Sequence, residues 1–380
     1  MEFNYTTEQQ EIKEQTFKFA RNEMLPFASK YDQSGEMPLT ILKKAWELGF
    51  VNTCIPVEYG GVGFTSQDTV NITEGLAYGC MGMNTVLMAN DLALLPIVIG
   101  GTHEQKEKFL RPFTEDYKIA SFCLTEPGNG SDAAGIKTSF KEDGDDWIIN
   151  GDKMWITNAG FADLFVVYGT IDSSLKHKGI SCLIVDAKTA GIEIGKAEKK
   201  MGHRCSDTRG MRFNNVRVPK ENMIGAPGDG WKIAMKTLDH SRPMVAASAL
   251  GGALCAYDHS VKYASERVQF GKPISSFQAI QFMIANMAMK IEASRLLINK
   301  AAWMLDNDIP NTKIASYAKA YAADSCMEIT TDAVQIFGGY GYSIEYPVEK
   351  LMRDAKLIQI YEGTSQIQRM VIAKEIFSRH

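Results

Sequence analysis

The hydrophobic periodicity of this chain changes twice, and no alternation of strand and helix accompanies the change. Residues 1–119 carry helical spacing, residues 120–229 carry short β-rich runs, and residues 230–380 return to long helical spacing. This order predicts a helical N-terminal domain, a middle β-domain and a C-terminal helical bundle. It argues against a Rossmann fold or a P-loop, which both place a glycine-rich turn between a strand and a helix.

Helix start signals recur in the first part of the chain. Thr6 and Thr7 each precede a glutamine by three residues, which is the spacing of a capping box. Thr102 can cap a later helix that has two glutamates near its start, where they suit the positive end of the helix dipole. Further helices are expected over residues 39–48, 66–78 and 83–95.

The dipeptide Asn150-Gly151 stands between two β-rich runs, residues 147–149 and 154–157. Both residues tolerate positive φ, and the pair is the strongest short signal for a β-hairpin. We therefore expect an antiparallel hairpin that turns at this dipeptide. Further strands are expected over residues 164–168, 180–185 and 216–218.

A heptad of apolar and small residues runs from Phe277 to Leu305 in alternating steps of three and four. A narrow seam of this kind indicates a helix bundle. Ser275 and Gln278 are spaced for a capping box at its start, and residues 307–310 (Asn-Asp-Ile-Pro) are expected to end it. The glycine clusters at 60–63 and 338–341 are expected to form turns.

Composition excludes several classes of protein. The chain has 380 residues, 45% of them hydrophobic, which is enough for a large core. Its net charge of -4 gives no basic footprint for nucleic acid or an anionic membrane. The apolar run from Leu92 to Ile99 is interrupted by Pro96 and is too short for a transmembrane helix. The seven cysteines are scattered and never spaced as a Cys-x-x-Cys pair, so we expect no disulfide framework and no metal site. The N-terminus lacks the pattern of a secretory signal, so we expect a cytoplasmic protein.

Two segments of the middle domain combine small residues, hydroxyls and an aromatic ring. Residues 121–132 (Ser-Phe-Cys-Leu-Thr-Glu-Pro-Gly-Asn-Gly-Ser-Asp) suit a close approach of the backbone to a ligand. Residues 153–158 (Lys-Met-Trp-Ile-Thr-Asn) place Trp155 near Thr157, so that the indole could cover a planar ring. Each pattern alone also fits a turn or a core tryptophan.

Four more motifs follow at residues 204–210 (Arg-Cys-Ser-Asp-Thr-Arg-Gly), 239–243 (Asp-His-Ser-Arg-Pro), 266–272 (Glu-Arg-Val-Gln-Phe-Gly-Lys) and 361–369 (Tyr-Glu-Gly-Thr-Ser-Gln-Ile-Gln-Arg). Together with the two segments above, in this order and spacing, they closely resemble the acyl-CoA dehydrogenase family, and its medium-chain and short-chain members most. The resemblance covers nearly the whole chain.

This resemblance implies an all-α N-terminal domain, a middle β-domain and a C-terminal four-helix bundle, assembled as a homotetramer with FAD at a subunit interface. The residues that match flavin contacts are Phe122, Leu124, Thr125, Ser131, Trp155, Thr157, Thr364 and Gln366, and, from a neighbouring subunit, Arg267, Gln269, Phe270, Gln278, Gln335 and Gly339. Those that match acyl-CoA contacts are Ser131, Asn84, Met88, Asp91, Leu92, Asp239, Ser241, Arg242, Tyr361, Gly363 and Lys374.

By the same resemblance, Glu362 is the catalytic base that removes the proton next to the thioester carbonyl, while the neighbouring hydride goes to flavin N5. A backbone N–H and a flavin hydroxyl would hold the thioester oxygen. A carbon acid of this kind is too weak to react with a carboxylate in water, so the pocket must exclude water and raise the pKa of Glu362. The alternative for Glu362 is a solvated carboxylate at a helix start, and Arg242 could be a structural ion-pair partner.

Asp91 departs from the family pattern, which commonly has a small hydroxyl residue at this position. Spacings of three, four and seven put Asn84, Met88, Asp91 and Leu92 on one helical face, which by resemblance lines the acyl cavity. Asp91 is therefore a candidate second base, suited to a cyclic or unsaturated acyl-CoA in a 1,4-elimination. The alternative is that its carboxylate turns away and hydrogen-bonds a neighbouring backbone group.

Three other functions stay open at this point. An acyl-CoA oxidase or an enoyl-CoA reductase would use the same scaffold with a different redox partner. A non-catalytic acyl-CoA-binding protein would have lost the chemistry, which the presence of Glu362 and of the flavin motifs argues against. The short C-terminus favours a dehydrogenase that passes electrons to an electron-transferring flavoprotein.

Overall fold

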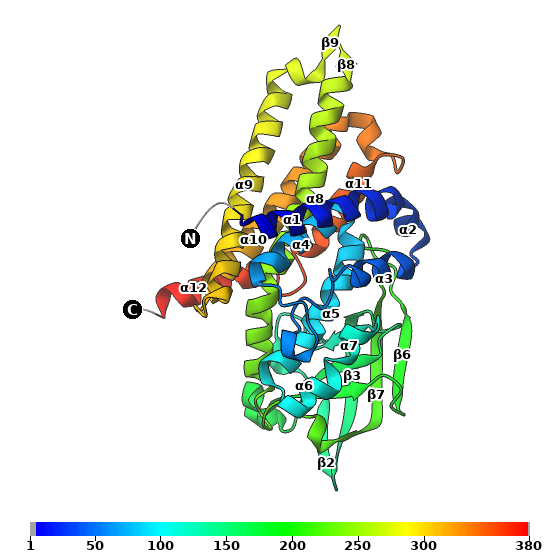
Figure 1. Ribbon diagram of the computed structural model, residues 1–380, viewed down its shortest axis with the longest axis vertical. Helices are drawn as coiled ribbons and strands as arrows, with labels where there is room; N and C mark the ends of the chain where they lie inside the picture. Colours follow the sequence, from blue (N-terminus) through cyan, green and yellow to red (C-terminus); the bar gives the residue numbers. More distant parts are fainter. Residues whose placement is uncertain (1–4, 379–380) are drawn as a thin grey trace.

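The computed structural model describes residues 5–378 as an elongated molecule, with a helical bundle at one end and a β-sheet domain at the other (Figure 1). The N-terminal helices lie beside the junction of these two parts and cover it. The predicted order of helices, strands and helices is confirmed.

The N-terminal part contains the capped helices that the sequence predicts. Thr6 and Thr102 each close a capping box with the glutamine three residues later. The helices are α1 (Thr7–Phe19), α2 (Ala28–Ser34), α3 (Leu39–Glu47), α4 (Ser66–Gly79), α5 (Met81–Gly100), α6 (His103–Phe109) and α7 (Pro112–Glu115).

Helix α5 is longer than the predicted segment, because it continues through Pro96 to Gly100. Among the described residues it is the one helix long and apolar enough to cross a bilayer, and 83% of its most apolar window is buried inside the protein. Its side chains join three apolar cores. One is shared with α4 and the long C-terminal helices, the second with strands of the sheet, and the third with the N-terminal helices. This helix therefore fixes the bundle to the β-domain.

The middle domain is a mixed sheet in the order β1-β4-β2-β3-β7-β6, with β5 paired to β4. Strand β4 runs parallel to β1 and β2, and the other pairs are antiparallel. The strands are β1 (Ala120–Cys123), β2 (Ser139–Asp143), β3 (Asp146–Thr157), β4 (Leu164–Thr170), β5 (Ile180–Asp186), β6 (Ile192–Ala197) and β7 (Thr208–Pro219).

The hairpin predicted at Asn150-Gly151 is wrong, because β3 runs unbroken through this dipeptide. The turn between β2 and β3 lies instead at Gly144, which has a φ of 61°. Gly151 allows the backbone of β3 to pass close to Thr138, the residue before β2. A Cβ atom at Gly151 would lie 2.6 Å from the Cα of Thr138, so no larger residue fits without movement.

The C-terminal part is the predicted bundle of long helices. Its elements are α8 (Gly230–Glu266), β8 (Val268–Gln269), β9 (Lys272–Pro273), α9 (Gln278–Asp306), α10 (Thr312–Phe337), α11 (Pro347–Ile358) and α12 (Ser365–Phe377). The small β8–β9 ribbon forms the tip of the molecule farthest from the sheet (Figure 1). The capping box predicted from Ser275 and Gln278 is wrong, because α9 begins after Phe277 without a side-chain cap.

Candidate active site

One cavity of about 290 Å³ lies where the bundle, helix α5 and the sheet meet. Its wall is formed by α5, by β1 and the segment that follows it, by the end of β3, by the first half of α8, and by the turn before α12 together with α12 itself. Its lining residues are Thr85, Met88, Ala89, Leu92, Phe122, Leu124, Thr125, Gly130, Ser131, Ala133, Trp155, Ile156, Thr157, Trp231, Met235, Leu238, Arg242, Tyr361, Glu362, Gly363, Ile367 and Val371. The wall is mostly apolar, and its two charged residues are Arg242 and Glu362.

Glu362 sits in the turn between α11 and α12, in a backbone conformation that few residues adopt. Its φ is 51° and that of the following Gly363 is 90°. A left-handed conformation costs a non-glycine residue about 1 kcal/mol, and such strain is often retained at functional sites. A Cβ atom at Gly363 would lie 2.6 Å from the side-chain nitrogen of Gln368, which explains the glycine. Thr364 then caps α12 by accepting a hydrogen bond from the N–H of Ile367 at 3.1 Å.

The carboxylate of Glu362 accepts a hydrogen bond from the hydroxyl of Ser241 on α8, with the oxygens 2.5 Å apart. Burial raises the pKa of Glu362 above its ordinary value, while the Ser241 hydrogen bond and the charges of Lys319 and Arg242 oppose that shift. A carboxylate whose pKa is raised is a stronger base than an ordinary one. The structure therefore supports the base over the solvated carboxylate.

Arg242 reaches the same cavity from α8, one residue after Ser241. Its guanidinium donates to Asp239 at 2.8 Å, and the second oxygen of Asp239 accepts from Thr312 at 2.6 Å. The Nε of Arg242 is buried and has no hydrogen-bond partner among the described residues. Arg242 is thus both a structural ion-pair partner and a donor available to a ligand. Asp239 itself is not part of the cavity wall.

The sheet side of the cavity carries the residues that the sequence assigns to the flavin. Phe122, Leu124, Thr125, Ser131, Trp155 and Thr157 all line it. A register shift between Lys153 and Ile156 marks a β-bulge, and Trp155 within it has a φ of 62° and is 57% exposed. The bulge turns a flat aromatic ring outward at the cavity, which fits a planar cofactor.

A buried ion pair holds this segment in place. The ammonium of Lys153 donates to Glu126 at 2.8 Å and to the carbonyl of Leu124 at 3.0 Å. The carboxylate of Glu126 also accepts the backbone N–H groups of Lys137 at 2.6 Å and Thr138 at 2.9 Å. Because every charge in this pair has several partners, the backbone beside Thr125 has one well-defined position.

Helix α5 presents a different face to the cavity from the predicted one. The residues that line the wall are Thr85, Met88, Ala89 and Leu92, which keep the spacing of three, four and seven but start one residue later. Met88 and Leu92 were predicted correctly as neighbours on this face, whereas Asn84 and Asp91 lie off it. Asn84 is buried and donates to the hydroxyl of Ser248 at 3.1 Å.

The carboxylate of Asp91 turns toward the loop that follows α3. It accepts the N–H of Cys54 at 2.9 Å and the hydroxyl of Thr53 at 3.2 Å. Burial raises the pKa of Asp91, and these hydrogen bonds oppose the shift. This arrangement is the alternative in which Asp91 binds a neighbouring backbone group, and it gives the carboxylate no place in the cavity wall.

Sequence reasoning missed a chain of buried groups behind Thr85. The hydroxyl of Thr85 lies 2.9 Å from Nδ1 of His203, and Nε2 of His203 lies 3.0 Å from the carbonyl oxygen of Asp354. Because a carbonyl only accepts, Nε2 carries the proton, and Thr85 must donate to Nδ1. The Thr85 oxygen is therefore left as an acceptor. The hydroxyl of Tyr361, also in the wall, is buried without a hydrogen-bond partner among the described residues.

The remaining predicted contacts lie away from this cavity. Gln366 and Lys374 are exposed on α12. The flavin contacts predicted for a neighbouring subunit are all exposed, namely Arg267, Gln269, Phe270, Gln278, Gln335 and Gly339. The first four lie in or close in the chain to the β8–β9 ribbon, which forms the tip of the bundle (Figure 1), and the last two lie at the end of α10. The cavity and the tip lie at opposite ends of α8.

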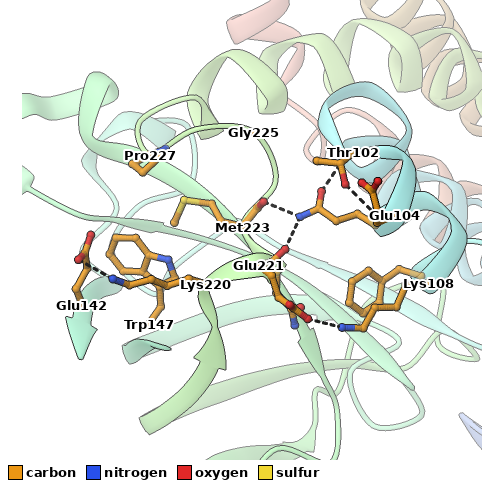
Figure 2. Close-up of a pocket in the computed structure, with 13 residues that line it drawn as sticks. Thr102, Glu104, Lys108, Glu142, Trp147, Lys220, Glu221, Met223, Gly225 and Pro227 are labelled. Atoms are coloured by element: carbon orange, nitrogen blue, oxygen red, sulfur yellow. Dashed lines mark hydrogen bonds and ion pairs between the residues drawn. The ribbon is translucent and has the colours of Figure 1, made fainter. Parts of the chain in front are cut away.

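A second hollow lies between α6 and the sheet (Figure 2) and has a different character. Gln105 donates to the carbonyls of Glu221 and Met223 at 2.7 and 2.8 Å. The two lysines in its wall are paired, Lys108 with Glu221 at 2.8 Å and Lys220 with Glu142 at 2.9 Å. These contacts join the N-terminal helices to the sheet, and they leave no unpaired lysine in its wall to bind a ligand.

Comparison with known proteins agrees with this geometry. Models of the acyl-CoA dehydrogenase N-terminal, middle and C-terminal domains match residues 6–116, 121–216 and 228–377. A probable medium-chain specific acyl-CoA dehydrogenase of Caenorhabditis briggsae is 45% identical over 377 residues, covering 98% of this chain and 91% of the relative.

Two solved structures have the same fold. The butyryl-CoA dehydrogenase from Megasphaera elsdenii is 42% identical, with a TM-score of 0.97 over 99% of this chain and 100% of the other. A chain in a structure described as the electron transferring flavoprotein of Acidaminococcus fermentans is 44% identical, with a TM-score of 0.97 and 99% coverage of both chains. With three domain models that together span almost its whole length, this chain belongs to the acyl-CoA dehydrogenase family.

Proposed function

We propose that this chain oxidises an acyl-CoA thioester to the 2-enoyl-CoA, with Glu362 as the base. The observation that carries the proposal is the position of the Glu362 carboxylate. It lies on a strained turn, is held by Ser241, and lines the same cavity as Trp155 and Thr157. A base with a raised pKa in a cavity that excludes water is what the weak acidity of a thioester α-carbon requires.

The residues of this chain account for the proton half of the reaction. Glu362 takes the proton from the α-carbon, and the electron pair of that C–H bond forms the new carbon–carbon double bond. FAD, when bound, accepts the hydride that leaves the β-carbon. The apolar residues of α5 and α8 exclude water, and the donor groups around Glu362 hold the carboxylate in one orientation.

The acyl group is an aliphatic chain of short to medium length. Met88, Ala89 and Leu92 from α5, with Met235 and Leu238 from α8, offer it apolar contacts and no charge. The butyryl-CoA and medium-chain relatives bear names that agree with such a substrate. The carboxyl group of Asp91 lies outside the wall, so the geometry gives no support to a second base.

The assembly is a homotetramer. Phe282, Met289 and Leu296 on α9 follow one another at intervals of seven and are 58%, 63% and 49% exposed. A stripe of large apolar side chains on one helix face is unusual on an isolated protein and is typical of a subunit interface. Electrons leave to an electron-transferring flavoprotein, a role supported by the similar chain in the Acidaminococcus structure. The cytoplasmic location stays a prediction.

Anaerobic bleaching of the flavin absorbance tests this function. The purified yellow protein is mixed with straight, branched and cyclic acyl-CoAs, and Glu362→Gln serves as the comparison. We expect rapid bleaching by straight-chain substrates, slowed about 10³-fold or more in the variant, because loss of a positioned general base costs about 10²–10⁴-fold. A protein that binds FAD but is bleached by no acyl-CoA would instead be the non-catalytic binding protein. Rapid re-oxidation of the bleached flavin by air would indicate an oxidase.

A further inference from the structure

Lys319 on α10 is fully buried, which is rare for a lysine, and it lies beside the turn that carries Glu362. Its ammonium donates to the carbonyl oxygen of Gly363 at 2.7 Å. A buried ammonium is costly unless it is paired, so a specific role must keep it there. No resemblance or sequence pattern had indicated this residue.

The turn needs donors at this point because of its unusual backbone. Two successive left-handed residues, Glu362 and Gly363, leave carbonyl oxygens without helical partners inside the protein. Gln368 donates to the carbonyl oxygens of Glu362 at 3.2 Å and of Gly363 at 3.0 Å. Lys319 adds the shortest and only charged bond to this pair of carbonyls.

The charge of Lys319 also acts on the carboxylate of Glu362. The charged groups that face the ammonium are Glu362 from the turn, Arg242 from α8, and Asp324 from its own helix. Burial lowers the pKa of Lys319 to about 8, the charge of Glu362 opposes this shift, and Arg242 adds to it. Conversely, the charge of Lys319 opposes the raised pKa of Glu362. Each group therefore sets the ionisation of the other.

We propose that Lys319 is a positioning residue for the reaction, which holds the Glu362–Gly363 turn through its hydrogen bond and keeps the Glu362 carboxylate ionised through its charge. The inference rests on the proposed role of Glu362 as base. Asp324 extends the same support, since it accepts bonds from Gln359, Ser365 and Arg369 on both sides of the turn.

The test compares Lys319→Met, which keeps the length of the chain but not its charge, with Lys319→Arg, which keeps the charge. Ser316→Ala is the matched control, because Ser316 is buried three residues earlier on α10 and its hydroxyl has no partner among the described residues. The rate of flavin bleaching is measured from pH 5.5 to pH 9 with the acyl-CoA that reduces the wild type fastest. Bleaching of the wild type itself reports on the proposed function separately.

We expect Lys319→Met to slow bleaching more than tenfold at pH 6 and to move the rise of rate with pH to higher pH, since removal of a nearby cation favours the neutral carboxyl. Lys319→Arg and Ser316→Ala should keep the wild-type position of that rise. A Lys319→Met enzyme whose rise stays in place, whether its rate is unchanged or lowered equally at every pH, would overturn the proposal, because a structural role alone predicts no shift.

If Lys319→Met does not fold, the reciprocal variant Glu362→Gln tests whether the charges of Lys319 and Glu362 affect each other. Without the carboxylate, the buried ammonium releases its proton at lower pH. The stability of the variant should therefore begin to rise at a lower pH than that of the wild type. We expect the difference in Tm, variant minus wild type, to increase between pH 7 and pH 9. A difference that is constant over this range would show that the two groups do not sense each other, and would overturn the proposal.

Discussion

The two ends of the C-terminal bundle differ in how complete they are within one chain. At the cavity end, Glu362 is held by Ser241 and its turn by Lys319, and these partners are fully buried. At the tip, Arg267, Gln269 and Phe270 are exposed on and beside the β8–β9 ribbon, and Phe270 is 93% exposed. The cavity end is preorganised by buried hydrogen bonds of its own chain, while the tip keeps its side chains exposed, with only an aromatic neighbour each for Arg267 and Phe270.

The distance between the two ends explains the difference. Ser241 lies in the first half of helix α8, and Arg267 lies just past the end of this helix. At a rise of about 1.5 Å per residue, about 40 Å separates the two residues. One FAD molecule at the cavity is too short to reach the tip of the same chain. If both sets of residues bind flavin, the tip must complete the site of a second subunit, as the family resemblance implies. Catalysis would then depend on the cavity residues of one chain, and retention of FAD would also depend on the tip residues of a second chain.

A charge at the tip provides the strongest test of this division. Phe270→Asp should leave the fold of the chain intact, because the ring is almost fully exposed. If the ring is buried in a subunit interface, its replacement by a carboxylate should cost about 2 kcal/mol or more of assembly and cofactor affinity, which is roughly 30-fold. We expect a colourless protein of reduced mass with normal helix content, measured by absorbance at the flavin band, light scattering and circular dichroism.

The matched control is Val57→Asp, which adds the same charge at another exposed apolar side chain, 67% exposed and on the N-terminal part. This variant should stay yellow and keep its mass. A Phe270→Asp protein that keeps full flavin content and mass would show that the tip does not complete a second site.

At the cavity end, Ser241→Ala should have a smaller effect that depends on pH. The variant lacks one hydrogen bond to the charged form of Glu362, so the pKa of Glu362 rises further. We expect the rise of bleaching rate with pH to move to higher pH, because a hydrogen bond to a charged group contributes about 1.5–3 kcal/mol and its loss favours the neutral carboxyl. The loss of rate should be largest at pH 6 and smaller at pH 9, where more of the carboxyl is ionised and only the orienting effect of the lost hydrogen bond is left. Ser241→Thr keeps a hydroxyl and should restore the original profile.

The sequence was sufficient where local signals and periodicity coincide. The capping threonines Thr6 and Thr102, the heptad of α9 and the order of the three parts are confirmed, because each is set by residues close in the chain. The hairpin at Asn150-Gly151 is wrong for the opposite reason. Gly151 is required because the backbone there passes close to Thr138, the residue before β2, and this contact exists only once β2 and β3 are paired.

In the candidate site, too, the sequence does not show contacts between segments that are distant in the chain. Helix α5 is buried on nearly all sides, so the pattern of its apolar residues does not predict which face lines the cavity. The face that lines the cavity starts at Thr85, one residue later than the predicted face. Lys319 was not predicted as a site residue, because a lone lysine on a helix usually points to solvent. Its neighbours on the same face, Ala315, Ala322 and Ala323, are all buried, and this pattern could have placed Lys319 in the core.

Asp91→Asn should have the smallest effect on catalysis and a measurable effect on stability. An asparagine oxygen can still accept the N–H of Cys54, but its amide cannot replace the charge that binds both Cys54 and Thr53. We expect turnover within about twofold of wild type and a loss of about 1 kcal/mol in urea unfolding. Asp91→Leu, which leaves the buried N–H of Cys54 unpaired, should lose about twice as much. A tenfold loss of bleaching by any straight, cyclic or unsaturated acyl-CoA in the stable Asp91→Asn enzyme would restore Asp91 as a second base, and would mean that α5 rotates toward the predicted face when the substrate binds.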